Sequence, residues 1–401
     1  MVYFPNGYLS PYGVSGLDRS SPLGPKFVVM NLNSREPMNQ VPANFKPVPY
    51  DPFYEAPEPD EAQTIQEIID TMAEIQRKTF QAQKHAIRSV HAKGLALLKG
   101  EFQVYDNLSD YLTQGLFAKP GTYPIVARLS TQPGDVLPDS VSTPRGISFK
   151  VFGVAGEHLP GAGEPDTQDF ILVNSPIFPQ QLKDFLSGLK RFDLLTNKAE
   201  GFKEGLSKTL RAVGEVVEKV TGSDTGVMPG MGGQLAVHPL GDTYYSQAAF
   251  LYGPYMAKFS LTPVSANLTA LKDQPIDIDS DDYALRLLLQ DFFATQGGEW
   301  EFGVQLSTDI DQMPVEDASV EWSQDESPYL TVGKLTITPQ SAWSDERAAV
   351  VDDKMAFSPW QGLLAHRPLG AIQRARNTTY QASAQFRRNL YGTSENPQDV
   401  K

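Results

Sequence analysis

The sequence predicts an α+β fold, in which short β-strands are interleaved with helices. From about residue 97, β-branched and aromatic residues recur in short runs that Gly and Pro interrupt, which is typical of strands. Longer segments carry apolar residues at three- and four-residue spacing, which is typical of amphipathic helices. No period of twenty to fifty residues recurs, so a solenoid or a propeller is not expected. With 401 residues, 40% of them hydrophobic, the chain can bury a large core.

The first 60 residues predict an extended arm. They hold 11 of the 31 prolines and show no lasting helical or strand period. We expect the aromatic residues of this arm to anchor it on the body of the protein or on a second subunit: Tyr3, Phe4, Tyr8, Phe27, Phe45 and Tyr54. A helix over 60–80 follows, with apolar residues at 65, 68, 69, 72 and 75.

Strands and helices then alternate to the C-terminus. Strands are predicted over 100–106, 122–131, 146–154, 169–174, 244–263 (interrupted), 300–308 and 330–339. Helices are predicted over 180–195, 202–220 and 281–296. The strands are expected to form a sheet or barrel core that the helices surround.

Charge and composition exclude several functions. The net charge of −14 works against binding to nucleic acid or to anionic membranes. Cysteine is absent, so any metal must be bound by oxygen or by one of five histidines. No run of eighteen apolar residues predicts a transmembrane helix, and the N-terminus lacks the pattern of a secretory signal, so a cytoplasmic protein is expected.

One helical stripe near the C-terminus is a candidate binding site. Tyr380 and Arg387 follow Arg376 by four and eleven residues, so on a helix all three lie within roughly 40° of one another. Such a stripe can bind an anion, or a metal that a tyrosinate ligates. A surface helix with scattered basic residues is the structural alternative.

Other polar residues stand in unusual places, each with an ordinary explanation. His91 follows Arg88 by three residues, and a lone histidine is often structural. Strand alternation places Arg128 and Ser130 on one face with Val126, where the arginine needs an anion or an acidic ion-pair partner. Asn174 ends an apolar strand, a place where asparagine usually serves a turn. Arg145, in "STPRG", is interpreted in the same way as a solvated turn residue.

Together these segments resemble the haem catalase superfamily, in its short catalase-related branch. The family's distal segment is matched by "VHAKG", its arginine strand by "ARLST", its asparagine segment by "NSPIF", and its proximal helix by R-x-x-x-Y with a further arginine seven residues on. The four motifs occur in the family's order and local spacing, and the resemblance covers about residues 60–391. It implies a catalase-like fold, an antiparallel β-barrel core with surrounding helices. It also divides the chain into the arm over 1–60, a haem domain over 61–391 and a tail over 392–401.

The resemblance implies heme b as the cofactor. Tyr380 is then the ligand of the iron, and Arg376 supports its phenolate charge. Arg88, Arg128 and Arg387 are then the contacts of the haem propionates.

On the other face of the haem, the resemblance implies three catalytic residues. His91 is the general acid and base, Asn174 orients the peroxide, and Ser130 fixes the tautomer of His91. Val90 and Phe178 complete the expected haem contacts.

Several departures from the family bear on the activity. Val173 and Asn174 stand where large catalases have paired asparagines, and Pro179 stands where an aromatic residue is usual. We expect an oxidoreductase acting on hydrogen peroxide or organic hydroperoxides. The alternatives are a fatty acid hydroperoxide isomerase or dehydratase, similar to the allene oxide synthases, and a non-catalytic haem carrier or sensor. Val90 stands where allene oxide synthases have a threonine, which favours peroxide chemistry. A homo-oligomer is expected, as is usual in the family.

Overall fold

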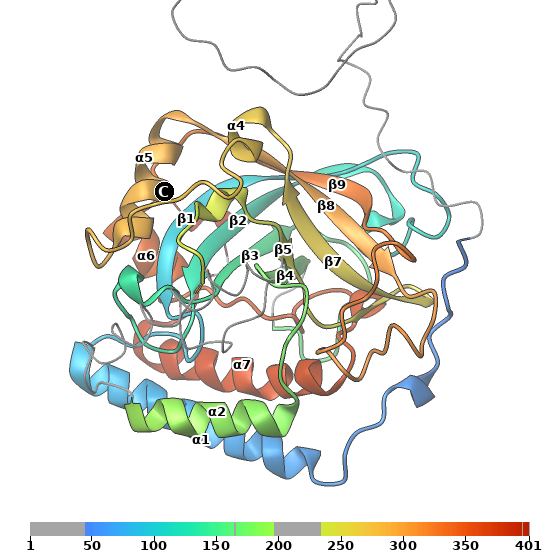
Figure 1. The fold of residues 1–401 in the computed structure, drawn as a ribbon, viewed down its shortest axis with the longest axis horizontal. Helices are drawn as coiled ribbons and strands as arrows, with labels where there is room; N and C mark the ends of the chain where they lie inside the picture. The colour runs from blue at the N-terminus through green and yellow to red at the C-terminus, as the bar shows by residue number, and fades with distance from the viewer. Residues whose placement is uncertain (1–44, 164–165, 196–233, 395, 401) are drawn as a thin grey trace, which may run out of the picture. The chain divides into compact units, whose positions relative to one another are not determined.

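Eight strands close into an antiparallel β-barrel (Figure 1). The computed structural model describes residues 45–163, 166–195, 234–394 and 396–400. Nine strands form its sheet; β6 lies outside the ring on β7, which leaves eight, and β5 closes the ring by pairing with both β4 and β7. The strands are β1 (Lys93–Val104), β2 (Gly121–Thr131), β3 (Arg145–Phe152), β4 (Thr167–Val173), β5 (Tyr244–Tyr245), β6 (Phe250–Tyr252), β7 (Tyr255–Pro263), β8 (Gly298–Leu306) and β9 (Leu330–Ile337).

Aromatic side chains fill the inside of the barrel. Phe302 of β8 is fully buried, and its ring lies 4.8 Å from that of Phe170, measured between centroids, and 5.4 Å from those of Phe102 and Phe259. Because successive side chains of a strand point to opposite faces, every second residue of these strands enters this core. The residues between them face outward, and on β2, β3 and β4 the outward face meets the helices and loops that form the site.

Three helices lie side by side against one end of the barrel: α1 (Glu61–Gln83), α2 (Leu182–Leu195) and α7 (Ala371–Tyr391) (Figure 1). Helix α1 buries Ile68 and Ile75, which belong to the apolar stripe that predicts it. The other helices are α4 (Ala266–Thr269), α5 (Ala284–Thr295) and α6 (Asp345–Val351), with short 3-10 turns at Pro52–Tyr54, Gly115–Ala118, Asp139–Val141, Pro239–Gly241, Leu364–His366 and Pro397–Asp399.

The α+β class and the barrel are confirmed. The predicted helices over 60–80, 180–195 and 281–296 correspond to α1, α2 and α5. Each predicted strand segment overlaps an observed strand. The first strand begins earlier than expected, at Lys93, because the "KGLALL" segment has no turn signal that separates it from the strand. The predicted helix over 202–220 lies outside the described residues.

The arm prediction is described only from residue 45 onward. There the chain is extended and lies against the barrel: the Val48 N–H donates to the Ser307 carbonyl at 2.8 Å, and Pro49 forms a bridge with Tyr255. Phe45 is buried and packs edge-on against Tyr111. Attachment of this segment to the body of the protein agrees with the first of the two anchoring alternatives. The three-part division of the chain and its subunit contacts stay predictions.

Within the described ranges, every helix is too short or too polar to cross a lipid bilayer.

Phe302→Ala should destabilise the protein by about 3–5 kcal/mol, because it removes a large side chain from the centre of a closely packed core. The midpoint of urea unfolding, followed by near-ultraviolet circular dichroism, measures the change. Phe53→Ala is the matched control, since the Phe53 side chain is 92% exposed, and its midpoint should stay close to the parent value. Equal midpoints for the two variants would contradict the proposed packing.

Candidate functional site

His91 lies in the loop between α1 and β1, and buried hydrogen bonds hold this loop in place. The Ser89 N–H donates to the Ser383 hydroxyl of α7 at 3.1 Å. Gln76 of α1 donates both to that hydroxyl, at 3.2 Å, and to the Ile87 carbonyl, at 2.8 Å. The loop that carries His91 is therefore attached to α1 and α7 at once.

The imidazole of His91 packs on the backbone of β3. A Cβ atom added to Gly146 would lie 2.7 Å from Cε1 of His91, so only a glycine leaves room for the ring. Its Nδ1 lies 3.3 Å from the Ser130 hydroxyl, and its Nε2 lies 3.2 Å from the side-chain nitrogen of Gln132. If the Gln132 N–H donates to Nε2, then Nδ1 carries the proton and donates it to Ser130.

The electrostatic surroundings keep His91 neutral. Burial lowers the pKa of His91 to about 3, with the positive charges of Arg128 and Arg376 acting in the same direction. A neutral imidazole with a free lone pair can accept a proton, which is what a general base requires.

Arg376 and Tyr380 face each other on α7. The Arg376 guanidinium donates to the Tyr380 hydroxyl at 3.1 Å, and its central carbon lies 5.2 Å from the centre of the phenol ring. Gln373, one turn earlier, accepts from Arg376 through its side chain at 3.3 Å, while its carbonyl accepts from the Trp360 indole at 2.6 Å. The four-residue spacing thus brings a cation onto the oxygen of the phenol, as the helical stripe predicts.

His91 and Tyr380 line the same cavity. Its volume is about 230 Å³, and Arg376 and Gln132 also reach it. The rest of its lining is mostly apolar and comes from α1, α2 and α7, including Met72, Leu182, Phe185, Leu189 and Ile372. A smaller cavity of about 40 Å³ shares His91 and Tyr380 with it and extends to Arg88, Arg128 and Ser130.

Three arginines from different elements surround one carboxylate. Nε of Arg128 donates to the Asp352 carboxylate, and Nε of Arg88 lies 4.0 Å from the same oxygen. Arg387 of α7 is 3% exposed, and its guanidinium donates to the Ser383 and Met355 carbonyls. Asp353 adds a second negative charge that acts on Arg88 and Arg387, so the three arginines outnumber the two carboxylates.

The protonation equilibria reflect this crowding. Burial, and then repulsion from Arg387 and Arg128, lowers the pKa of Arg88, and burial with repulsion from Arg128 lowers that of Arg387 to about 10. With a pKa of about 10, Arg387 remains charged near neutral pH. Burial alone would raise the pKa of Asp352, but Arg128 and Arg88 outweigh it and lower that pKa. Nε of Arg88 and Nε of Arg387 are buried and have no hydrogen-bond acceptor among the described residues. The arginine cluster can therefore accept further negative charge.

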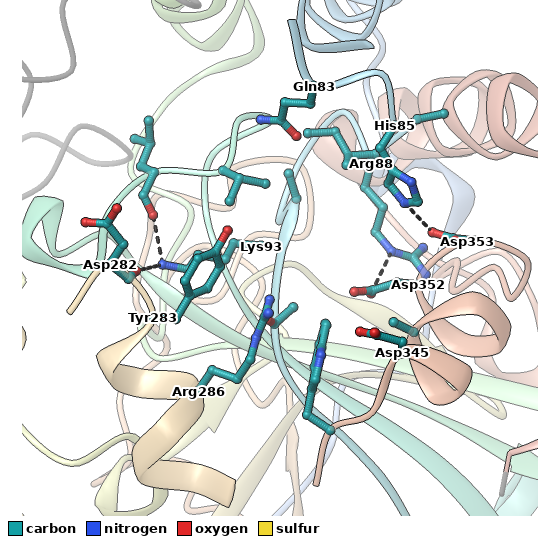
Figure 2. Close-up of a pocket in the computed structure, with 18 of the residues that line it drawn as sticks. Gln83, His85, Arg88, Lys93, Asp282, Tyr283, Arg286, Asp345, Asp352 and Asp353 are labelled. Atoms are coloured by element: carbon teal, nitrogen blue, oxygen red, sulfur yellow. Dashed lines mark hydrogen bonds and ion pairs between the residues drawn. The ribbon is translucent and has the colours of Figure 1, made fainter.

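A third cavity, of about 680 Å³, lies on the other side of this cluster. Figure 2 shows Arg88 and Asp352 on one wall, beside the hydrogen bond of 2.8 Å between His85 and Asp353. Lys93 and Arg286 occupy the facing wall with Tyr283 and Asp282 (Figure 2). Charges of both signs line this space, unlike the apolar cavity that holds His91.

Part of the sequence, and the fold, are similar to those of catalases. Residues 60–187 match the family model described as Catalase. The fold is similar to that of a fungal catalase, with 18% identity and a TM-score of 0.52, over 80% of this chain and 64% of that one. It is also similar to catalase A from Saccharomyces cerevisiae, with 19% identity and a TM-score of 0.53, over 80% and 66%. The chain therefore has the fold of the catalases, and residues 60–187 match that family's model.

The chain spans less than two thirds of the length of either of those catalases. No curated protein sequence matches it. The likeness to the two structures, at 18% and 19% identity, shows the fold alone. The roles of individual residues must therefore be argued from this chain's own geometry.

Most of the predicted site residues meet in space. His91, Val90, Phe178, Arg376 and Tyr380 line the apolar cavity. Ser130, Arg88 and Arg128 line the smaller cavity next to it, and Arg387 lies in the arginine cluster. Arg128 has both features that the sequence left as alternatives, since it is paired with Asp352 and also belongs to a cluster with excess positive charge.

Asn174 is the exception. Among the described residues, those lining the apolar cavity include Val173 but not Asn174. Its side-chain oxygen accepts from the Arg145 backbone N–H at 3.0 Å, and its nitrogen donates to Asp242 at 3.2 Å. Because successive residues of a strand point to opposite sides, Val173 points into the cavity and Asn174 points away. The predicted contact of Asn174 with a peroxide is therefore not supported by its position.

The interpretation of Arg145 as a solvated turn residue is wrong. Arg145 is 2% exposed and begins β3, where it pairs with Asp242 at 3.2 Å and donates to the Leu235 carbonyl at 2.7 Å. The local "STPRG" pattern does not show that β5 and the preceding loop cover this turn.

Two residues near the site were not predicted. Gln132 continues the alternation Val126, Arg128, Ser130 by one more step, so the strand pattern itself contains the signal that finds it. Asp352 gives no such signal, because its contact with Arg128 joins residues 224 positions apart.

Nitrogen NMR of protein prepared without haem and labelled at its histidines should show His91 neutral from pH 8 down to about pH 4. Burial and two nearby arginines lower the pKa of His91 to about 3, which keeps the ring neutral, and the proton should reside on Nδ1 because the Gln132 N–H donates to Nε2. His91→Gln identifies the signal by its loss. A His91 signal that titrates near the ordinary histidine value of roughly 6.5 would show that water and counter-charges reach the ring.

Proposed function

We propose that this chain is a haem-dependent oxidoreductase that acts on peroxides. The observation that carries the proposal is that a neutral histidine, His91, and a phenol bonded to a guanidinium, Tyr380 with Arg376, line one apolar cavity. The catalase-family match over residues 60–187 supports the same chemistry. Heme b is the proposed form of the cofactor.

The residues of this structure fit a haem. Its carboxylates would meet the arginine cluster, where the arginines outnumber the carboxylates and Arg88 and Arg387 each have a buried Nε without an acceptor among the described residues. The apolar side chains of the cavity would cover its ring, and the Tyr380 oxygen would bind its iron. When bound, the haem supplies a metal that binds a peroxide and accepts oxidising equivalents from it. Among the described residues there is no cluster of His, Asp and Glu suited to hold a bare metal ion, so Tyr380 within a haem site is the proposed ligand.

On the tyrosine side, Arg376 controls the charge of the ligand. A phenolate is stabilised by a guanidinium that donates to its oxygen, and Arg376 donates to the Tyr380 oxygen at 3.1 Å. Gln373 restricts the guanidinium through its side-chain oxygen. These contacts hold the Tyr380 oxygen beside a positive charge, where it would bind the iron.

On the opposite side, His91 moves a proton. With its Nδ1–H directed at Ser130, the Nε2 lone pair can take the proton from one peroxide oxygen when the Gln132 N–H no longer donates to it. The same nitrogen then returns the proton to the other oxygen as the O–O bond breaks, which releases water or an alcohol. The low pKa of His91 keeps Nε2 unprotonated before each cycle.

The lining of the cavity bears on the substrate. Met72 of α1 and Leu182, Phe185 and Leu189 of α2 offer an apolar surface to whatever approaches His91. Such a surface suits the hydrocarbon part of an organic hydroperoxide as well as hydrogen peroxide. It also favours the second candidate function, isomerisation or dehydration of a fatty acid hydroperoxide, which product analysis distinguishes from reduction to an alcohol.

Tyr380→Phe should lower haem retention at least about tenfold, or leave a haem with an altered ferric spectrum, because it removes the proposed iron ligand. Absorption spectra and haem content of protein from haem-sufficient cells measure this. Tyr123→Phe is the matched control, on β2 and in neither cavity, and should retain the parent spectrum. A parent without a Soret band that also fails to take up haem ends the proposal. An unchanged spectrum in Tyr380→Phe moves the ligand elsewhere.

His91→Ala should keep its haem but lose peroxide turnover by roughly 10²–10⁴-fold, the usual contribution of a positioned general acid and base. Hydrogen peroxide, tert-butyl hydroperoxide and a fatty acid hydroperoxide are assayed in parallel, with product analysis for the last. Equal consumption of all three by parent, variant and free haemin would instead indicate a haem carrier or sensor.

A further inference from the structure

Gln132 lies beside Nε2 of His91, where the sequence had placed Asn174. Its side-chain nitrogen lies 3.2 Å from Nε2 of His91, the nitrogen that must exchange a proton with the substrate. It lines the apolar cavity together with His91 and Tyr380, whereas Asn174 is bonded to Arg145 and Asp242 outside that cavity.

The backbone holds Gln132 firmly beside the histidine loop. Its N–H donates to the Pro144 carbonyl at 3.1 Å, and its carbonyl accepts from the Thr143 hydroxyl. The next residue, Pro133, accepts from the Ala92 N–H at 2.9 Å. Gly134 approaches the same loop so closely that an added Cβ would lie 2.1 Å from the Ser89 carbonyl oxygen. These contacts fix the residues that follow β2 against the residues that flank His91.

The chemistry of an amide suits this place. A peroxide beside Nε2 of His91 loses a proton to it and gains negative charge, which an N–H donor stabilises. Gln132 offers such a donor already directed at this point, on a strand end fixed by backbone hydrogen bonds. Gln180 and Gln247 also line the cavity, but no hydrogen bond joins either side chain to His91 among the described residues, and Gln247 donates to the Ile177 carbonyl.

We propose that Gln132, and not Asn174, is the amide that orients the peroxide. Without substrate its N–H donates to Nε2 of His91 and holds the ring with its proton on Nδ1. With substrate the N–H donates to the peroxide oxygen that lies against Nε2. This role rests on the proposed peroxide chemistry, and it assigns the orienting donor to the second strand of the barrel.

Gln132→Leu and Gln132→Glu test this role. Leucine removes the donor at similar volume, and glutamate replaces the donor with an acceptor of the same shape. In protein prepared without haem, the nitrogen NMR signal of His91 Nε2 should lose its hydrogen-bond shift with leucine, and should become that of a protonated Nε2 with glutamate. In haem-loaded protein, both variants should keep the parent haem content and lose peroxide turnover by about 10–10²-fold, the range expected for loss of one donor to a developing charge.

Gln103→Leu, an exposed residue of β1, is the control for the substitution itself and should match the parent in both measurements. An unchanged His91 signal in both Gln132 variants would overturn the hydrogen bond. A changed signal with full turnover would show that Gln132 only packs beside His91, which also overturns the proposal. If the parent itself lacks turnover, the proposed function fails and the orienting role fails with it. An active parent with an equally active Gln132→Leu overturns the role of Gln132 alone.

Discussion

The hydroxyl of Ser383 fixes the distance between the two halves of the site. It lies one turn beyond Tyr380 on α7 and accepts the N–H of Ser89, two residues before His91, although the two serines are 294 positions apart in the chain. Gln76 of α1 donates to the same oxygen. Because these groups are buried, loss of the hydroxyl would leave donors without an acceptor, at a cost of about 1–3 kcal/mol. The loop with the proton acceptor and the helix with the phenol are thus held at one separation by polar contacts, while apolar side chains of the three helices close the space between them.

Burying the arginine cluster is energetically unfavourable in the protein by itself, and added negative charge would offset this cost. Burying charges without full pairing is unfavourable, and the three arginines outnumber Asp352 and Asp353, the carboxylates that act on them. The lowered pKa values of Arg88 and Arg387 express this cost. A ligand that carries carboxylates would reduce the repulsion among the arginines, and this reduction would contribute to its binding free energy. This explains why Asp352 can pair with Arg128 without excluding an anion-binding role for the cluster.

Local periodicity predicted the parts of this site that lie on single elements. The 3.6-residue period of α7 places Arg376 on Tyr380, and the two-residue period of β2 places Ser130 beside His91 and extends to Gln132. The four motifs of the resemblance then indicated which elements meet. The orientation of the Asn174 side chain could not be predicted, because its strand ends in a turn where Arg145 and Asp242 both form hydrogen bonds with its amide. The contact of Asp352 with Arg128 could not be predicted, because it joins β2 to the end of α6. Such a contact depends on how the barrel closes, which no local pattern contains.

The apolar cavity and the basicity of His91 are linked. Burial among apolar side chains lowers the pKa of His91 to about 3, so the folded protein leaves this ring unprotonated across the range in which an exposed histidine gains a proton. Between about pH 6.5 and pH 3 the unfolded chain therefore binds more protons than the folded chain at this residue, and stability at this site is complete above about pH 6.5 and falls as the pH is lowered. His238 and His366, whose pKa values burial lowers to about 4, act in the same direction. Burial of His91 thus lowers the stability of the protein in acid and keeps the ring unprotonated at neutral pH. The same apolar surface also determines which molecules can approach Nε2.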